Sequence, residues 1–178
     1  MKRTTKRIIS LILAVCMLSA FSVSSFAANV SNLSSYVFRS KLNTNYVLNI
    51  YVDGTPSSGA AVKAYTYDSS DTNQIWQYYN SPSTGYVYLR NMYTNPMLVL
   101  AASGNTDSNG HNVAIVERMN ETVYGSAQQF TVGSNGGYYY FNNVYFNEAL
   151  TMTEARNGGI INFQSYLPGY STQLWLAD

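Results

Sequence analysis

Asn73-Gln74-Ile75-Trp76 is the first of three related blocks in this chain of 178 residues, and the others are Ala127-Gln128-Gln129-Phe130 and Thr172-Gln173-Leu174-Trp175. Each block has the form Gln-x-aromatic, and successive second-position glutamines are 54 and 45 residues apart. Recurrence at such a period is typical of folds assembled from several similar units. The sequence therefore predicts three units, each ending in one block.

Two short stretches of alternating apolar and polar residues precede each block. They cover residues 46–50 and 59–65 in the first unit, 96–100 and 110–116 in the second, and 148–152 and 158–164 in the third. Alternation with period two indicates β-strands, and the turn signals Asp53-Gly54, Asn109-Gly110 and Asn157-Gly158 separate them. No segment has a convincing helical period, so we predict an all-β fold.

The aromatic residue of each block has a structural role in this scheme. One unit of a few short strands cannot bury its own apolar face, whereas three units that close on each other can. We therefore place Trp76, Phe130 and Trp175 in a shared core. The accompanying glutamine has both a donor and an acceptor, so it can satisfy backbone groups near a turn.

The N-terminus has the pattern of a secretory signal peptide. A basic start is followed by an apolar run from Ile8 to Phe21 and by small residues up to Ala28. We expect cleavage after Ala27, which divides the chain into a signal peptide, 1–27, and one domain, 28–178. The apolar run is short for a membrane span, and we expect no span in the mature chain. The predicted location is secreted and extracellular.

Cleavage changes the charge balance of the chain. The mature domain keeps six Lys and Arg against nine Asp and Glu, a net charge of −3, and it keeps all 17 Tyr. An acidic surface argues against nucleic acid and against anionic membranes as partners. Tyrosine-rich surfaces with little charge suit neutral polyhydroxy ligands, and they suit protein partners equally well.

Catalytic and metal-binding patterns are weak. The only Cys, Cys16, lies in the signal peptide, and the only His, His111, lies in a turn. With one His and no Cys, the mature domain cannot supply a catalytic nucleophile with its base or a set of zinc ligands. We therefore predict no cofactor, no metal and no enzymatic activity. A small hydrolase is the lowest-ranked of our hypotheses. Its two carboxylates would be Glu117 with Glu121, or Glu148 with Glu154. Asp68 and Asp71 lack the ligand density of a calcium loop.

The three blocks and the strands before them resemble the ricin B-type lectin family. The likeness covers the chain from about Tyr36 to its end, and residues 45–76 are especially similar to secreted modules of Gram-positive bacteria. The resemblance implies a β-trefoil, in which twelve short strands form three pseudo-equivalent repeats.

The family's sugar sites imply binding residues in repeat one. An acidic position, an aromatic ring and an Asn-Gln pair correspond here to Asn49, Tyr65, Asn73 and Gln74. Asn49 departs from the family because an amide cannot form the charge-assisted bonds of a carboxylate. The nearby Asp53 would compensate if its side chain points into the site. For each residue a second interpretation stays open: Tyr65 as a surface ring, Asn73 as a turn cap, and Gln74 as a structural residue.

The other repeats depart further from this pattern. Repeat two has Val99, Val116, Ala127 and Gln128, which cannot stack on a sugar or bind its hydroxyls, and repeat three has Thr151, Gln164, Thr172 and Gln173, with Tyr166 nearby. The resemblance thus implies a non-catalytic module that binds a glycan or polysaccharide through one main shallow site. The alternative is a protein-interaction trefoil, either an inhibitor or an accessory subunit of a secreted assembly.

Overall fold

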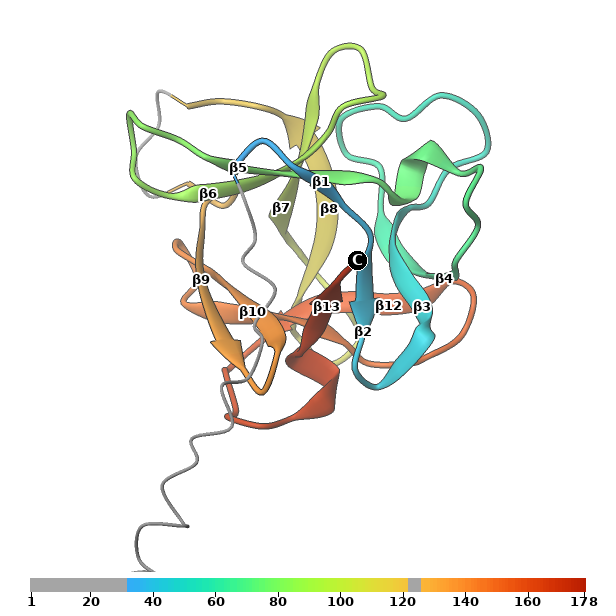
Figure 1. Ribbon diagram of the computed structural model, residues 1–178, viewed down its shortest axis with the longest axis vertical. Helices are drawn as coiled ribbons and strands as arrows, with labels where there is room; N and C mark the ends of the chain where they lie inside the picture. Colours follow the sequence, from blue (N-terminus) through green and yellow to red (C-terminus); the bar gives the residue numbers. More distant parts are fainter. Residues whose placement is uncertain (1–31, 122–125) are drawn as a thin grey trace, which may run out of the picture.

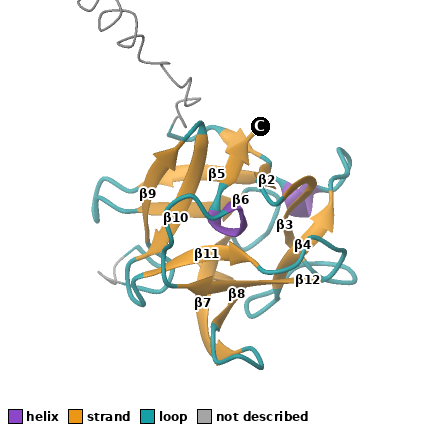
Figure 2. Ribbon diagram, turned by 90° about the horizontal axis from the view of Figure 1, so that it is seen from below, coloured by secondary structure: helices purple, strands orange, loops and turns teal. Residues whose placement is uncertain are grey.

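A computed structural model of the protein describes residues 32–121 and 126–178. The expected signal peptide, residues 1–27, lies outside this part. Figure 2 shows that the strands make up the body of the molecule, and helix in the described part is confined to two short 3-10 turns. Within the same residues, no helix is both long enough and apolar enough to cross a membrane.

The strands fall into three successive groups. The first holds β1 (Ser35–Tyr36), β2 (Phe38–Ser40), β3 (Asn43–Ile50), β4 (Val62–Thr66), η1 (Thr72–Gln74) and β5 (Trp76–Asn80). The second holds β6 (Val87–Asn91), β7 (Leu98–Thr106), β8 (Asn112–Arg118) and β9 (Phe130–Asn135). The third holds β10 (Tyr138–Asn143), β11 (Glu148–Met152), β12 (Gly159–Gln164), η2 (Ser171–Gln173) and β13 (Trp175–Ala177).

The groups obey one pairing rule. The first strand of each repeat pairs with the last strand of the preceding repeat, and with the second and last strands of its own. Thus β6 pairs with β5, β7 and β9, while β10 pairs with β9, β11 and β13. In repeat one this strand is divided: β1 pairs with β5, and β2 pairs with β13 and β3.

The division of that strand accounts for the thirteenth strand. Between its two parts, Val37 exchanges two backbone hydrogen bonds with Asp178, of 2.9 and 3.1 Å, so the chain stays extended there. The prediction of three repeats of four strands is confirmed, with one strand interrupted. The fold is a β-trefoil.

The middle two strands of each repeat form an antiparallel hairpin, and the three hairpins meet one another (Figure 1). Their contacts run in a circle: Ala61 bridges to Ile115, Val113 pairs with Asn162, and Ile160 pairs with Lys63. The candidate site of repeat one lies beside the hairpin of β3 and β4.

The predicted core is confirmed. Trp76, Phe130 and Trp175 have no solvent exposure, belong to one buried cluster, and begin the fourth strand of their respective repeats. Equivalent positions in the sequence thus occupy equivalent positions in the fold.

Candidate functional site

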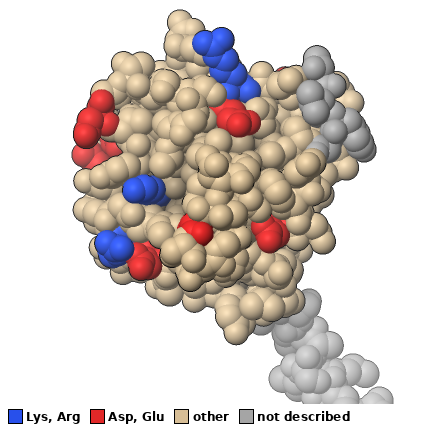
Figure 3. Space-filling view, turned by 180° about the vertical axis from the view of Figure 1, so that it is seen from behind, with Lys and Arg blue, Asp and Glu red and all other residues tan. Residues whose placement is uncertain are grey.

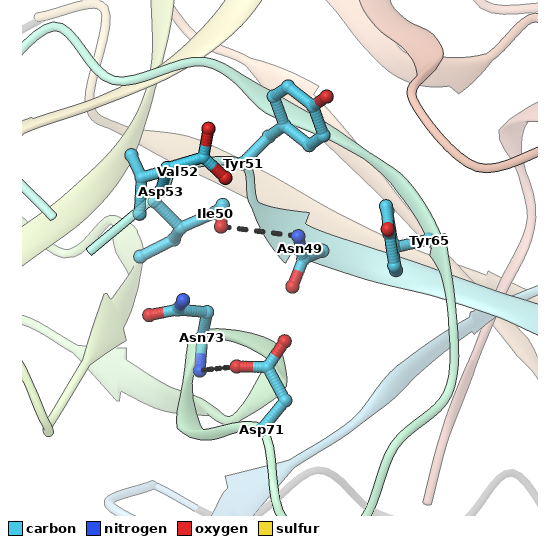
Figure 4. A pocket seen from close by; sticks show the side chains of 8 residues that line it. All are labelled: Asn49, Ile50, Tyr51, Val52, Asp53, Tyr65, Asp71 and Asn73. Carbon is cyan, nitrogen blue, oxygen red and sulfur yellow. Dashed lines mark hydrogen bonds between the residues drawn. The ribbon is translucent and has the colours of Figure 1, made fainter. Parts of the chain in front are cut away.

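A pocket of about 220 Å³ opens beside η1 in repeat one. The end of β3 and the residues after it form one wall, β4 contributes a ring, and the turn before β5 forms the opposite wall (Figure 4). The lining consists of Asn49, Ile50, Tyr51, Val52, Asp53, Tyr65, Asp71 and Asn73. Three of the four residues predicted from the sequence, Asn49, Tyr65 and Asn73, therefore come together here.

Asn49 reaches the pocket because of the alternation along β3. Ile50 pairs with Val62 and faces the core, so Asn49, one residue earlier, points to the opposite face. Its side-chain Nδ2 donates to the carbonyl of Ile50 over 3.1 Å. The reverse orientation of the amide would set two oxygens against each other, so this bond directs Oδ1 away from the backbone.

The Oδ1 atom of Asn49 is a buried acceptor without a partner. The residue is 5% exposed, and Oδ1 receives no hydrogen bond from the described residues. Figure 4 shows this oxygen turned toward the side of the pocket where Asp71 and Asn73 lie. Leaving a buried acceptor unsatisfied costs about 1–3 kcal/mol, so a ligand that donates a hydrogen bond here recovers that cost.

Two tyrosine rings stand at one end of the pocket. Tyr65 comes from β4 and Tyr51 follows β3, and their ring centres are 6.2 Å apart with planes tilted by 41°. The Nζ of Lys63 lies 4.5 Å from the centre of the Tyr51 ring. A tyrosine ring offers a flat apolar face together with a polar hydroxyl, the combination that fits the C–H face of a sugar ring.

The opposite wall is the single helical turn η1. Asp71 caps this turn, since its side chain accepts a hydrogen bond from the backbone N–H of Asn73 over 2.9 Å. The cap holds Asn73 at the pocket, where its amide can both donate and accept. Asp53 enters from the loop after β3, so the pocket has two carboxylates where the family pattern has one.

Gln74 is placed differently from the other three predicted residues. It is fully buried outside the pocket lining: its Oε1 accepts from the N–H of Asp68 over 2.9 Å and its Nε2 donates to the carbonyl of Thr66 over 3.0 Å. Gln74 therefore ties the loop between β4 and η1 to the turn that carries Asn73.

The other two glutamines make the same pair of bonds. Gln128 accepts from the N–H of Asn120 and donates to the carbonyl of Arg118, while Gln173 accepts from Leu167 and donates to Ser165. The distances are 2.9 and 2.8 Å for Gln128 and 2.8 and 2.9 Å for Gln173. The prediction that these side chains satisfy backbone groups near a turn is confirmed in all three repeats.

The sequence reasoning missed two lining residues that carry polar groups, Tyr51 and Asp71. A signal existed for each. Tyr51 is two residues after Asn49 and thus shares its strand face, and Asp71 is two residues before Asn73, the spacing of a side-chain cap. Asp68, considered together with Asp71 for calcium, instead accepts from the N–H and hydroxyl of Ser70.

The corresponding positions of repeats two and three are built for packing or internal bonding. Val99 and Val116 have no exposure, so they offer nothing to a ligand. In repeat three the Thr151 hydroxyl donates to the carbonyl of Ala149, and the Gln164 side chain donates to Asn162. Tyr166 stacks on Tyr140 with 4.2 Å between ring centres.

His111, the only histidine of the chain, lies beside Asp107, whose carboxylate is taken up by structural hydrogen bonds. Its Nδ1 is 3.6 Å from Oδ1 of Asp107, and that carboxylate accepts from Asn162 and from two backbone N–H groups. Burial would raise the pKa of Asp107, but these hydrogen bonds and the nearby imidazole lower it below its usual value. In the part of the chain that the structure describes, no three His, Cys, Asp or Glu side chains gather as a metal site would require.

Comparison with known proteins supports the fold. The profile of the family described as ricin-type beta-trefoil lectin domain-like matches residues 25–116, just over half of the chain. No curated protein matches the sequence of the chain.

Solved structures extend the likeness to most of the chain. A mosquitocidal holotoxin is 25% identical with a TM-score of 0.70 over 84% of this chain, which spans 18% of the holotoxin chain. ThreeFoil, a designed 3-fold symmetric protein, is 23% identical, with a TM-score of 0.66 over 80% of this chain and 96% of its own. The ricin B-like lectin of Macrolepiota procera, solved in complex with lactose, is 14% identical, with a TM-score of 0.66 over 84% of this chain and 98% of its own. The strand pairing repeats three times, and Gln74, Gln128 and Gln173 make the same two hydrogen bonds in their repeats. Together with the matched profile, these features show that the chain belongs to the family of ricin-type β-trefoil lectin domains.

Proposed function

We propose that the protein is a secreted, non-catalytic carbohydrate-binding module whose main site is the pocket of repeat one. The observation that carries the proposal is the unpartnered Oδ1 of Asn49 within the same pocket as the ring of Tyr65. A sugar ring presents hydroxyl donors beside an apolar face, so it can satisfy the oxygen while it contacts the tyrosine.

The surface chemistry supports this class of ligand. Figure 3 shows one face of the molecule that is mostly uncharged, with its Lys and Arg apart from one another and some of them beside an acidic side chain. Such a surface lacks the clustered Lys and Arg that bind phosphate backbones. The ricin B-like lectin that shares this fold was solved with lactose, and a galactose-like sugar is the first ligand to test.

Binding at one shallow site is expected to be weak, with a dissociation constant on the order of millimolar. Useful affinity for a polysaccharide would then come from several copies on one polymer. The experiment is calorimetric titration or a glycan array with the wild type and Tyr65→Ala. The variant should lose binding by about tenfold or more, which corresponds to about 1.4 kcal/mol.

Tyr67→Ala is the matched control for that experiment. Tyr67 lies two residues further along, lines no part of the pocket, and packs under the guanidinium of Arg39, 4.1 Å from the ring centre. Its loss should leave sugar binding as it is in the wild type. Equal affinities for the wild type and Tyr65→Ala would show that the site is elsewhere, and release of reducing sugar from polysaccharides would overturn the non-catalytic assignment.

Secretion has its own test. Protein recovered from the culture medium should begin at Ala28, which mass spectrometry of the intact chain measures. A full-length chain retained in the cell fraction would contradict both the cleavage site and the location.

Protein interaction is the second candidate function, and one observation favours it. The turn after the first strand of each repeat exposes an apolar or aromatic residue: Leu42 at 39%, Tyr93 at 61% and Tyr145 at 66%. Exposed rings of this kind are common at protein interfaces. This candidate predicts no glycan binding by the wild type, and loss of binding to a defined protein partner when Tyr93 and Tyr145 are replaced by Ser.

A further inference from the structure

The pocket of repeat one carries negative charge without a counter-charge in its lining. Asp53 and Asp71 both line it, and no Lys or Arg does. Neither carboxylate forms an ion pair with another of the described residues. The nearby Lys63 lies over the Tyr51 ring and outside the lining. A ligand in this pocket therefore meets two carboxylates.

The neutral groups of the pocket add to its acceptor character. Asn49 is 95% buried, one N–H of its amide donates to the carbonyl of Ile50, and its unpartnered Oδ1 can only accept. One oxygen of Asp71 accepts from the backbone of Asn73, and Figure 4 shows the other turned toward Asn49. Among the amide and carboxyl groups of the lining, the remaining donors are the Asn73 side chain and the second N–H of Asn49, against the acceptors of Asn49, Asn73, Asp53 and Asp71.

The aromatic end of the pocket also tolerates positive charge. The ammonium of Lys63 already rests 4.5 Å from the centre of the Tyr51 ring, the geometry of a cation–π contact. Tyr65 stands 6.2 Å from Tyr51, measured between ring centres. A second cation at the Tyr65 ring would find a similar π face, with the carboxylate of Asp71 on the wall formed by η1.

We infer that this pocket prefers hexosamines with a free amino group over neutral hexoses, and that it discriminates against uronic and other acidic sugars. A protonated amine is a charged donor that can reach the unsatisfied oxygen of Asn49 and the carboxylate of Asp71, which lie on the same side of the pocket, while Asp53 adds negative charge from the other wall. A uronic acid would place a third carboxylate among them. The inference rests on the proposed function, because it assigns a substrate class to the same site.

The size of the preference follows from the exposure of the carboxylates. Charge pairs open to solvent contribute little each, so we expect the amino sugar to bind roughly three- to tenfold more tightly than its neutral counterpart. The preference should fall as salt is added, since ions screen exposed charges within about 10 Å at 0.1 M.

The experiment titrates the full chain with methyl glycosides of glucosamine, glucose, N-acetylglucosamine and glucuronic acid, at slightly acidic pH where the free amine is protonated. The wild type should bind glucosamine most tightly and glucuronic acid most weakly. In the double variant Asp53→Asn/Asp71→Asn the ratio of the glucosamine and glucose affinities should fall close to one. Asn keeps the side-chain cap of η1, so the turn is retained.

Glu154→Gln is the matched control, because it removes one carboxylate from an exposed site outside the pocket. It should keep the full preference for glucosamine. A preference that persists in the double variant, or that disappears on addition of a chelator, would overturn the inference. So would equal binding of glucosamine and ethanolamine, since the pocket would then recognise an ammonium group without its sugar.

The remaining outcomes separate the two proposals. If glucose and glucosamine bind equally and Tyr65→Ala abolishes both, the sugar site stands and the preference for amines is wrong. If lactose binds and none of the four glycosides does, the sugar site stands and the preference for amines is wrong. If neither lactose nor any of the four glycosides binds, the proposed function fails and the inference fails with it.

Discussion

The indole Nε1 of Trp76 donates a hydrogen bond to the carbonyl of Leu48 over 2.9 Å, 28 residues earlier in the chain. Trp175 makes the equivalent bond to Leu150 over 3.1 Å. Both acceptors lie in the second strand of a repeat and both donors in the fourth. The bond therefore joins the hairpin of a repeat to its closing strand inside the core.

Trp76→Phe should destabilise the protein. The smaller ring leaves space in a packed core, and the buried carbonyl of Leu48 loses its donor, which alone costs about 1–3 kcal/mol. Urea denaturation measures the change in the free energy of unfolding. Tyr93→Phe, at an exposed ring, is the control and should change it by less than about 0.5 kcal/mol. Equal stabilities of wild type and Trp76→Phe would show that the bond contributes nothing.

The fold was predictable because its determinants repeat. The same Gln-x-aromatic block appears three times, and each copy does the same two things, filling the core and bridging a loop. The interruption between β1 and β2 was not predictable, because it depends on how Val37 pairs with the C-terminal Asp178. A contact between residues so far apart leaves no local pattern.

Gln74→Leu should lower both stability and sugar affinity. The change removes the partners of the Asp68 N–H and the Thr66 carbonyl, at a cost of about 0.5–1.5 kcal/mol for each bond, since both residues are open to solvent. It also releases the turn that holds Asn73 at the pocket. Denaturation and calorimetry, at a temperature where both proteins are folded, measure the two effects.

Gln128→Leu is the matched control for that pair of measurements. It breaks the same kind of bridge in repeat two, so it should destabilise the protein by a similar amount and leave sugar binding unchanged. Loss of sugar affinity in both variants would mean that the effect of Gln74→Leu comes from general instability.

The candidate site was predictable only where strands supply its residues. Asn49 and Tyr65 lie on β3 and β4, whose alternation fixes the face on which each side chain emerges. Asp53 and Asp71 come from a loop and a turn, and the direction of their side chains depends on contacts that have no sequence period. The pocket's second carboxylate therefore emerged only from the structure.

Gly133→Ala should destabilise the pairing of β9 in repeat two with β10 in repeat three. Gly133 pairs across the strands with Tyr140, and a methyl group there would overlap the Tyr140 ring and its hydroxyl. The ring would have to leave its stack on Tyr166, and overpacking of this kind costs about 1–3 kcal/mol. In a Tyr140→Ala background the same glycine substitution should cost much less. A double-mutant cycle on unfolding free energies tests this, and additive effects would show that the ring does not limit the position.

Asp107 should make the free energy of unfolding depend on pH. Because hydrogen bonds lower its pKa in the folded state, the unfolded chain takes up the proton more readily. The stabilisation is thus complete above the usual pKa of about 3.9 and is lost as pH falls through the lower, folded value. Asp107→Asn should be less stable than the wild type at neutral pH, with a gap that narrows in acid. Glu154→Gln, at an exposed carboxylate, is the control, and a gap that stays constant with pH would contradict the prediction.

Asp71 should contribute to binding in two separable ways, through its charge and through the cap that it forms on η1. Asp71→Asn removes the charge and keeps an acceptor for the N–H of Asn73, whereas Asp71→Ala removes both. Calorimetry with a neutral sugar should therefore show the larger loss for Asp71→Ala, because the turn no longer holds Asn73 in place. Asp68→Ala is the control: it removes a similar bond, from the N–H of Ser70 over 2.9 Å, at a residue outside the pocket lining, and it should retain sugar affinity. Equal losses for the two Asp71 variants would mean that Asn73 keeps its position without the cap, and that only the charge of Asp71 acts on the ligand.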